Sequence, residues 1–167
     1  MKALVAIPTL GLALIFQSAI ISRITMLSGC ADLVLLVLAA WGLRSGSRHV
    51  WIWAVIAGLM VGYVSHQPLL IPVAAYLLVM FLARLMQHHI WQAPLLGMYL
   101  LTFAGTLITM SATYLTLWFG DVQLPLGETF LQIVLPALLL NLLLAIPVHP
   151  LIRDLSAWLH PAEIVEA

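Results

Sequence analysis

The sequence contains few charged residues and a single cysteine. Aspartate, glutamate, lysine and arginine make up 7% of its 167 residues and 64% are hydrophobic, whereas a soluble domain carries about a quarter charged residues to cover a surface that faces water. Most of the surface is therefore expected to face lipid. Cys30 is the only cysteine, so it can form neither an internal disulfide nor a thiolate metal cluster. A formal net charge of zero provides no electrostatic attraction to nucleic acid.

Long apolar runs predict an all-α integral membrane protein. A spanning helix needs about 20 apolar residues, so the chain has room for a bundle of about six transmembrane helices and for no folded domain outside the membrane. Residues 1–150 are expected to form this single transmembrane domain. The polar residues between the apolar runs place the expected spans at 3–22, 31–43, 50–64, 69–81, 95–118 and 129–148.

The distribution of lysine and arginine predicts the orientation, because these residues accumulate in short cytoplasmic loops. With a cytoplasmic N-terminus, Arg23 alone falls on the outer side, and the inner side holds Lys2, Arg44, Arg48, Arg84 and Arg153. Both termini are therefore expected in the cytoplasm. The first run could also be a cleaved signal peptide, but its full span length favours a retained helix.

Three polar side chains stand at or within the apolar runs. Asp32 opens the second expected span, where a carboxylate can cap the free N–H groups of a helix; the alternative is a contact with a partner. Asn141 lies near the middle of the last span and Gln17 lies in the first, and such amides are best satisfied by hydrogen bonds between helices. All three are interpreted as structural rather than catalytic, with Asp32 as the partner-sensitive position.

Small residues recur on two expected spans. Gly58 and Gly62 have a spacing that lets a neighbouring backbone approach closely, either within the bundle or in another subunit. One face of the fifth span carries small and hydroxylated residues, namely Thr102, Gly105, Thr106, Thr109 and Thr113. This face is expected to pack against a helix, and the alternative is the polar lining of a pocket.

The segment after Pro150 is expected to form a short amphipathic cytoplasmic tail, 151–167. Its apolar side chains fall on one face and Arg153 lies off that face; the apolar residues are Leu151, Ile152, Leu155, Trp158 and Leu159. The simplest interpretation places the tail along the inner membrane surface, with Trp158 at the headgroup level. Docking of a cytoplasmic partner is the alternative.

No residue pattern favours an enzyme or a metal site. His88 and His89 are adjacent, so on a helix they would point about 100° apart, unlike the two ligands of a zinc helix. No serine, histidine and acid can be grouped on one side of the membrane with any specificity. We therefore expect no enzymatic activity, no metal and no cofactor.

Four segments carry short motifs that resemble those of one bacterial family. Phe-Gln-Ser at 16–18 looks like the glutamine-bearing first helix of that family, and Ala-Asp-Leu-Val-Leu-Leu at 31–36 looks like its second helix, with alanine where proline is usual. Gly-Leu-Met-Val-Gly-Tyr-Val at 58–64, continuing into Gln67 and Pro68, looks like its third helix, with Ser65 and His66 where an acid is common. Its terminal signature resembles Asn-Leu-Leu-Leu-Ala-Ile at 141–146, followed by Pro147, Pro150, Leu151, Ile152, Arg153 and Leu155. By these motifs the chain resembles the bacterial rod shape-determining protein MreD family.

The resemblance implies a non-enzymatic, multi-pass protein of the bacterial inner membrane that is needed for rod cell shape. Its partners would be MreC and membrane lipids, and through MreC the MreB filaments, RodA and a class B transpeptidase of peptidoglycan elongation. It also implies a fold similar to the substrate-binding subunits of energy-coupling-factor vitamin transporters. A small-ligand-binding transporter subunit is therefore the alternative function. Asp32, Gln17, Gly58, Gly62, Asn141 and Arg153 are the candidate partner-binding or structural positions.

Overall fold

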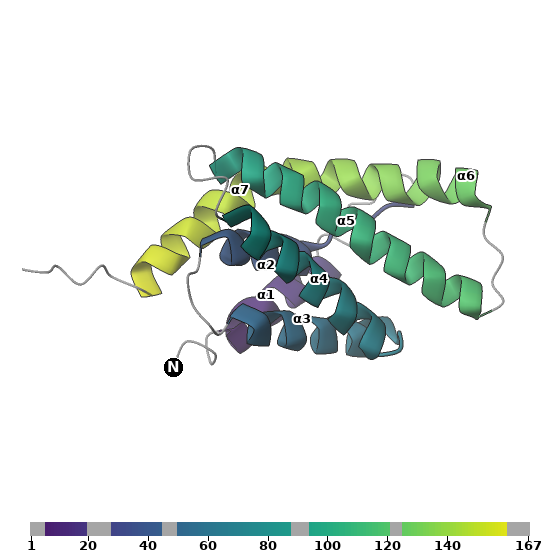
Figure 1. The fold of residues 1–167 in the computed structure, drawn as a ribbon, viewed down its shortest axis with the longest axis horizontal. Coiled ribbons are helices and arrows are strands. Elements are labelled where there is room, and N and C mark those ends of the chain that lie inside the picture. The colour runs from purple at the N-terminus through teal and green to yellow at the C-terminus, as the bar shows by residue number, and fades with distance from the viewer. Residues whose placement is uncertain (1–5, 20–27, 45–49, 88–93, 121–124, 160–167) are drawn as a thin grey trace, which may run out of the picture.

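The computed structural model describes residues 6–19, 28–44, 50–87, 94–120 and 125–159, and all the elements within these ranges are helices (Figure 1). In chain order they are α1 (Ala6–Ala19), α2 (Leu33–Arg44), α3 (Val50–Ser65), α4 (Leu70–Gln87), α5 (Pro94–Phe119), α6 (Leu126–Thr129), the π-helical turn η2 (Phe130–Val134) and α7 (Leu135–Leu159). The predicted all-helical fold is confirmed.

Helix α2 lies at the centre because apolar side chains surround its axis. It has no polar face between Leu33 and Leu43, and a helix that is apolar all round belongs in a core. It contacts α1, α3, α4, α5 and α7, and every side chain from Val34 to Trp41 is buried. Trp41 stacks on Trp53 of α3 with ring centroids 4.3 Å apart.

The surrounding helices point large apolar side chains outward. Leu70 of α4, Phe119 of α5 and Leu143 of α7 are 83%, 76% and 63% exposed. Each would cost roughly 25 cal/mol for every Å² of apolar surface left in water. An outer surface of this kind belongs against lipid or against another transmembrane helix.

Three helices are long and apolar enough to cross a membrane, Leu70–Gln87, Pro94–Phe119 and the continuous stretch Gly127–Trp158. The other three, α1, α2 and α3, have 14, 12 and 16 residues, which is about 21, 18 and 24 Å at 1.5 Å per residue. These are shorter than the hydrocarbon layer of about 30 Å. With α6, η2 and α7 counted as one continuous helix, the described part of the chain has six helices, of which three are full-length candidate spans. Six complete crossings stay a prediction.

The C-terminal end of α4 differs from the expected one. α4 continues to Gln87 instead of ending near Phe81, because Ala83 is buried against the bundle and prolongs the packed face. The turn before it matches the expectation, since α3 ends at Ser65 and α4 begins at Leu70. His66 in this turn has a φ of 54°, the left-handed conformation that ends a helix.

The expected tail is not separated from the last span in the structure. α7 runs through Pro147 and Pro150 to Leu159, and Figure 1 shows its yellow end turned away from the line of its green part, as prolines within a helix produce. The helix continues because Ile152 is buried against the bundle, whereas Trp158 is 79% exposed. Residues 160–167 of the expected tail lie outside the described residues.

Candidate functional site

The first turn of α2 is capped by side chains from three different parts of the chain. The first N–H groups of any helix lack partners within the helix. Here the Leu35 N–H donates to Asp32 Oδ1 (3.0 Å), the Val34 N–H donates to Gln17 Oε1 of α1 (3.2 Å), and the Asp32 N–H donates to Asn141 Oδ1 of α7 (2.7 Å). The three polar residues found in the apolar runs therefore meet at one point, which we call the polar junction.

Two further side chains complete the polar junction. The hydroxyl of Tyr76, on α4, donates to Asp32 Oδ2 at 2.8 Å, and Tyr76 is 1% exposed. Asn141 Nδ2 donates to Thr106 Oγ1 of α5 at 2.9 Å, and the Thr106 hydroxyl donates to the Thr102 carbonyl at 2.8 Å. The polar junction thus ties α1, α2, α4, α5 and α7 together through hydrogen bonds that lipid could not replace.

Glycine and proline set the approach of the segment that precedes α2. Residue 136 is a proline without an N–H, so the carbonyl of Gln132 lacks the donor that an α-helix would give it. The Ser28 N–H donates to that carbonyl at 3.1 Å. A Cβ on Gly29 would lie 2.6 Å from the backbone nitrogen of Ala137, so only glycine fits there. No local pattern in the chain marks Gly29, because its contact in α7 is more than a hundred residues away.

The other sequence-predicted residues lie away from the polar junction. Gly58 and Gly62 face the start of α4: a Cβ would lie 2.4 Å from Val73 Cα at Gly58 and 2.9 Å from Pro72 Cγ at Gly62. Both belong to packing between α3 and α4 within the bundle. Arg153 is 58% exposed at its side chain and pairs with Asp154, Nε to Oδ1 2.9 Å. A surface ion pair of this kind contributes about 0–1 kcal/mol, so its structural role is small.

A polar cavity of about 180 Å³ adjoins the polar junction. Residues from α1, α3, α4, α5 and the segment before α2 line it. Its polar lining consists of Gln17, Cys30, Asp32, Ser65, Gln67, Tyr76, Thr109 and Thr113. The hydroxylated face of α5 is therefore divided between two uses: Thr102 and Thr106 are buried in helix packing, and Thr109 and Thr113 line the polar cavity.

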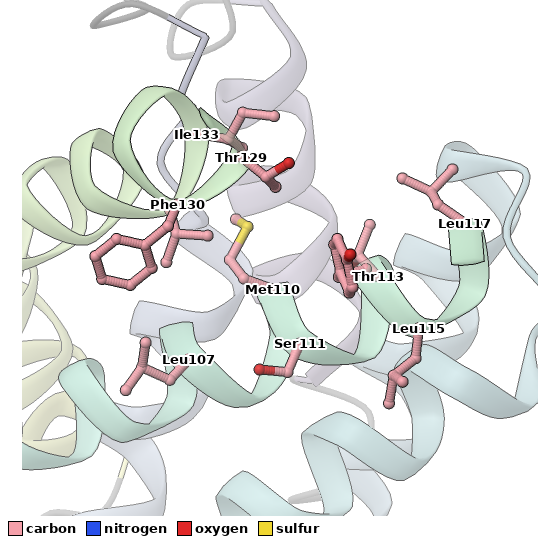
Figure 2. A pocket seen from close by; sticks show the side chains of 11 residues that line it. Leu107, Met110, Ser111, Thr113, Leu115, Leu117, Thr129, Phe130 and Ile133 are labelled. Atoms are coloured by element: carbon pink, nitrogen blue, oxygen red, sulfur yellow. The ribbon is translucent and has the colours of Figure 1, made fainter. Parts of the chain in front are cut away.

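An apolar groove of about 410 Å³ lies between α5 and η2. Figure 1 shows the C-terminal half of α5 diverging from α6, and Figure 2 shows Phe130 of η2 reaching back toward α5, near Leu107 and Met110. Ser111 is exposed on this groove, and its hydroxyl makes no hydrogen bond within the described part of the chain. Met110 and Thr113 line both hollows.

The chemistry of these sites is that of hydrogen bonding and apolar packing. Among the described residues, no three histidine, cysteine, aspartate or glutamate side chains are grouped so as to hold a metal ion. No protein-family model matches the chain, and no curated protein or solved structure gives a significant match. Functional assignment therefore rests on the polar junction, the polar cavity and the apolar groove.

Proposed function

We propose that the chain is a non-enzymatic scaffold of the bacterial inner membrane that helps to assemble the machinery of cell-wall elongation, with both termini in the cytoplasm. The observation that carries the proposal is the apolar groove between α5 and η2. A transmembrane segment of a partner would fill it, and the resemblance of the sequence to MreD proteins makes MreC that partner. MreB, RodA and the class B transpeptidase would be reached through MreC.

The lining of the groove suits a helix better than an acyl chain. Leu107, Met110, Phe130 and Ile133 offer apolar contact, which either occupant could use. Ser111, however, places a hydroxyl that has no hydrogen-bond partner among the described residues on a surface that otherwise faces lipid. Helices in membranes associate through small residues and hydroxyl hydrogen bonds, whereas an acyl chain has no polar group to meet such a hydroxyl.

The alternative function, a vitamin-binding transporter subunit, draws support from the polar cavity. Its volume of about 180 Å³, however, lies below the roughly 300–1,000 Å³ of pockets that enclose drug-sized ligands. A molecule as large as a vitamin would not be enclosed. The scaffold is therefore the better-supported function.

Cross-linking tests the proposed contact directly. In a Cys30→Ser background, Ser111→Cys is expected to form a disulfide with a cysteine scanned along the transmembrane helix of MreC. Leu143→Cys is the control, because Leu143 is 63% exposed on α7 and does not line the groove. Equal cross-linking at both positions would contradict a specific groove contact. Recovery of an ATPase with its coupling subunit, in place of MreC, would support the transporter alternative.

Filling the groove is expected to weaken assembly. Ser111→Trp should weaken the affinity for MreC by about 5- to 140-fold and so reduce its recovery with the tagged protein. Forcing extra volume into a packed interface costs about 1–3 kcal/mol, and each 1.4 kcal/mol is about tenfold in affinity. Leu143→Trp should leave recovery unchanged. Membrane insertion, measured by fractionation, should be normal for both variants.

A further inference from the structure

The polar cavity presents hydrogen-bond acceptors. An ionised carboxylate has about four acceptor positions, and Asp32 uses two of them, one for the Leu35 N–H and one for the Tyr76 hydroxyl. Asp32 therefore keeps acceptor positions for a further donor. No lysine, arginine or histidine is among the described residues that line the cavity.

Three hydroxyl groups of the lining already donate their hydrogens within the protein. The Tyr76 hydroxyl gives its only hydrogen to Asp32. The hydroxyls of Thr109 and Thr113 donate theirs to carbonyls of their own helix at 3.0–3.1 Å. Thr113 Oγ1 also accepts from Gln67 Nε2 at 3.4 Å, which leaves one of its two acceptor positions open. Each of these oxygens can only accept a hydrogen bond from an occupant of the cavity. Gln17 differs from them: its amide oxygen accepts from the Val34 N–H, so its amide nitrogen can only donate to an occupant of the cavity.

A cavity that contains one acidic side chain and several acceptor oxygens suits a small cation with several N–H donors. We propose that the polar cavity binds a primary ammonium group, held by the carboxylate of Asp32 and the oxygens of Tyr76 and Thr113. An ammonium group has three donors and a full positive charge, which matches this lining. The volume of about 180 Å³ accommodates such a headgroup and excludes a large ligand.

Two sources carry this chemistry, a soluble alkylamine and the ethanolamine headgroup of a phospholipid. The lining includes Ser65, which is exposed at the end of α3, so the cavity reaches the molecular surface beside the α3–α4 turn. Either source could enter from there. Binding of an ammonium group in the polar cavity does not require a partner in the apolar groove.

The test compares cations on the purified full-length protein in detergent. Ethylammonium chloride at a hundredfold excess over its Kd is expected to raise the midpoint of thermal unfolding by about 5–10 °C relative to sodium chloride at equal ionic strength. Tetramethylammonium chloride, which has the charge but no N–H donor, should give no such rise. An equal effect of all three salts would overturn the proposal, and this comparison needs no variant.

Lipid nanodiscs distinguish the two sources. A higher midpoint with phosphatidylethanolamine than with phosphatidylcholine, whose quaternary headgroup lacks N–H donors, would assign the cavity to the lipid headgroup. An ethylammonium effect without a lipid effect would assign it to a soluble amine. If neither the lipid effect nor the ethylammonium effect is seen, the proposed ammonium site is overturned.

Matched variants place the effect at the cavity. Asp32→Asn keeps the shape of the side chain and removes its charge, so the ethylammonium shift is expected to disappear. Glu128→Gln removes an exposed acid on α6 that does not line the cavity and should keep the full shift. A shift that survives Asp32→Asn, or that is lost in Glu128→Gln, would contradict the assignment. If Asp32→Asn does not fold, the comparison of cations on the unaltered protein still decides.

Discussion

Replacing Gly58 by alanine is expected to destabilise the helical bundle by about 2 kcal/mol. The added Cβ would lie 2.4 Å from Val73 Cα and 2.8 Å from Val73 N. Both are backbone atoms, so no side-chain rotation can relieve the overlap and α3 must move away from α4. Overpacking costs about 1–3 kcal/mol or more, against a gain of up to about 1 kcal/mol from removing a glycine within a helix. Unfolding in detergent by heat or denaturant measures the difference.

Two other glycines calibrate this result. A Cβ on Gly11 of α1 would meet only Met60 Cε, at 3.7 Å, which is ordinary van der Waals contact, so Gly11→Ala should be neutral or slightly stabilising. Gly62→Ala should fall between the two, because its nearest neighbours are the side-chain atoms Pro72 Cγ at 2.9 Å and Leu69 Cδ2 at 3.1 Å. Equal stability of Gly58→Ala and Gly11→Ala would show that α3 and α4 are not in this contact.

Replacing Asn141 by leucine is expected to cost about 1–3 kcal/mol and to loosen the start of α2. Leucine has a similar size but no amide, so the Asp32 N–H loses its acceptor at 2.7 Å and Thr106 Oγ1 loses its donor at 2.9 Å. An unsatisfied buried donor costs about 1–3 kcal/mol, although hydrogen bonds between helices in membranes average only about 0.6 kcal/mol. Thermal unfolding gives the total, and hydrogen exchange of the Asp32 and Val34 amides reports the local effect.

Gln132 supplies the matched control for Asn141. Its side chain is exposed on η2, and the contact to Ser28 uses only its backbone carbonyl, so Gln132→Leu should change stability by less than about 0.5 kcal/mol. A double-mutant cycle of Asn141→Leu with Thr106→Val isolates the side-chain hydrogen bond. If Asn141→Leu were as stable as Gln132→Leu, the bonds from Asn141 would have no energetic role in the polar junction.

The helical fold and the contact with lipid could be predicted because each depends on the sum of many similar contributions along the chain. The fifth expected span, 95–118, differs from α5 (Pro94–Phe119) by one residue at each end. The break between α3 and α4 was equally clear from Ser65 to Pro68. The end of α4 was missed because Arg84 and Gln87 look like loop residues, yet the buried Ala83 keeps that turn packed.

Individual residues of the polar junction could be predicted from the sequence, but the fact that they meet at one place could not. Gln17, Asp32 and Asn141 stand out because an amide or a carboxylate is costly in an apolar segment. Tyr76 does not stand out, since a tyrosine within an apolar helix is ordinary, and its role depends on the partner of its hydroxyl. Gly29 was missed for the same reason: its importance lies in the backbone of α7 that touches it.

The sequence by itself determined that the surface is largely apolar, that the fold is helical, and which polar residues had to find partners. Each of these follows from burial and transfer free energies, which act on each side chain nearly independently. The tertiary structure decided which partners they found. It placed α2 at the centre and satisfied the N–H groups of Asp32, Val34 and Leu35 from α7, α1 and the Asp32 side chain. It also left a polar cavity and an apolar groove beside α5. Such features depend on contacts between residues up to 109 positions apart, and no local pattern in the chain encodes them.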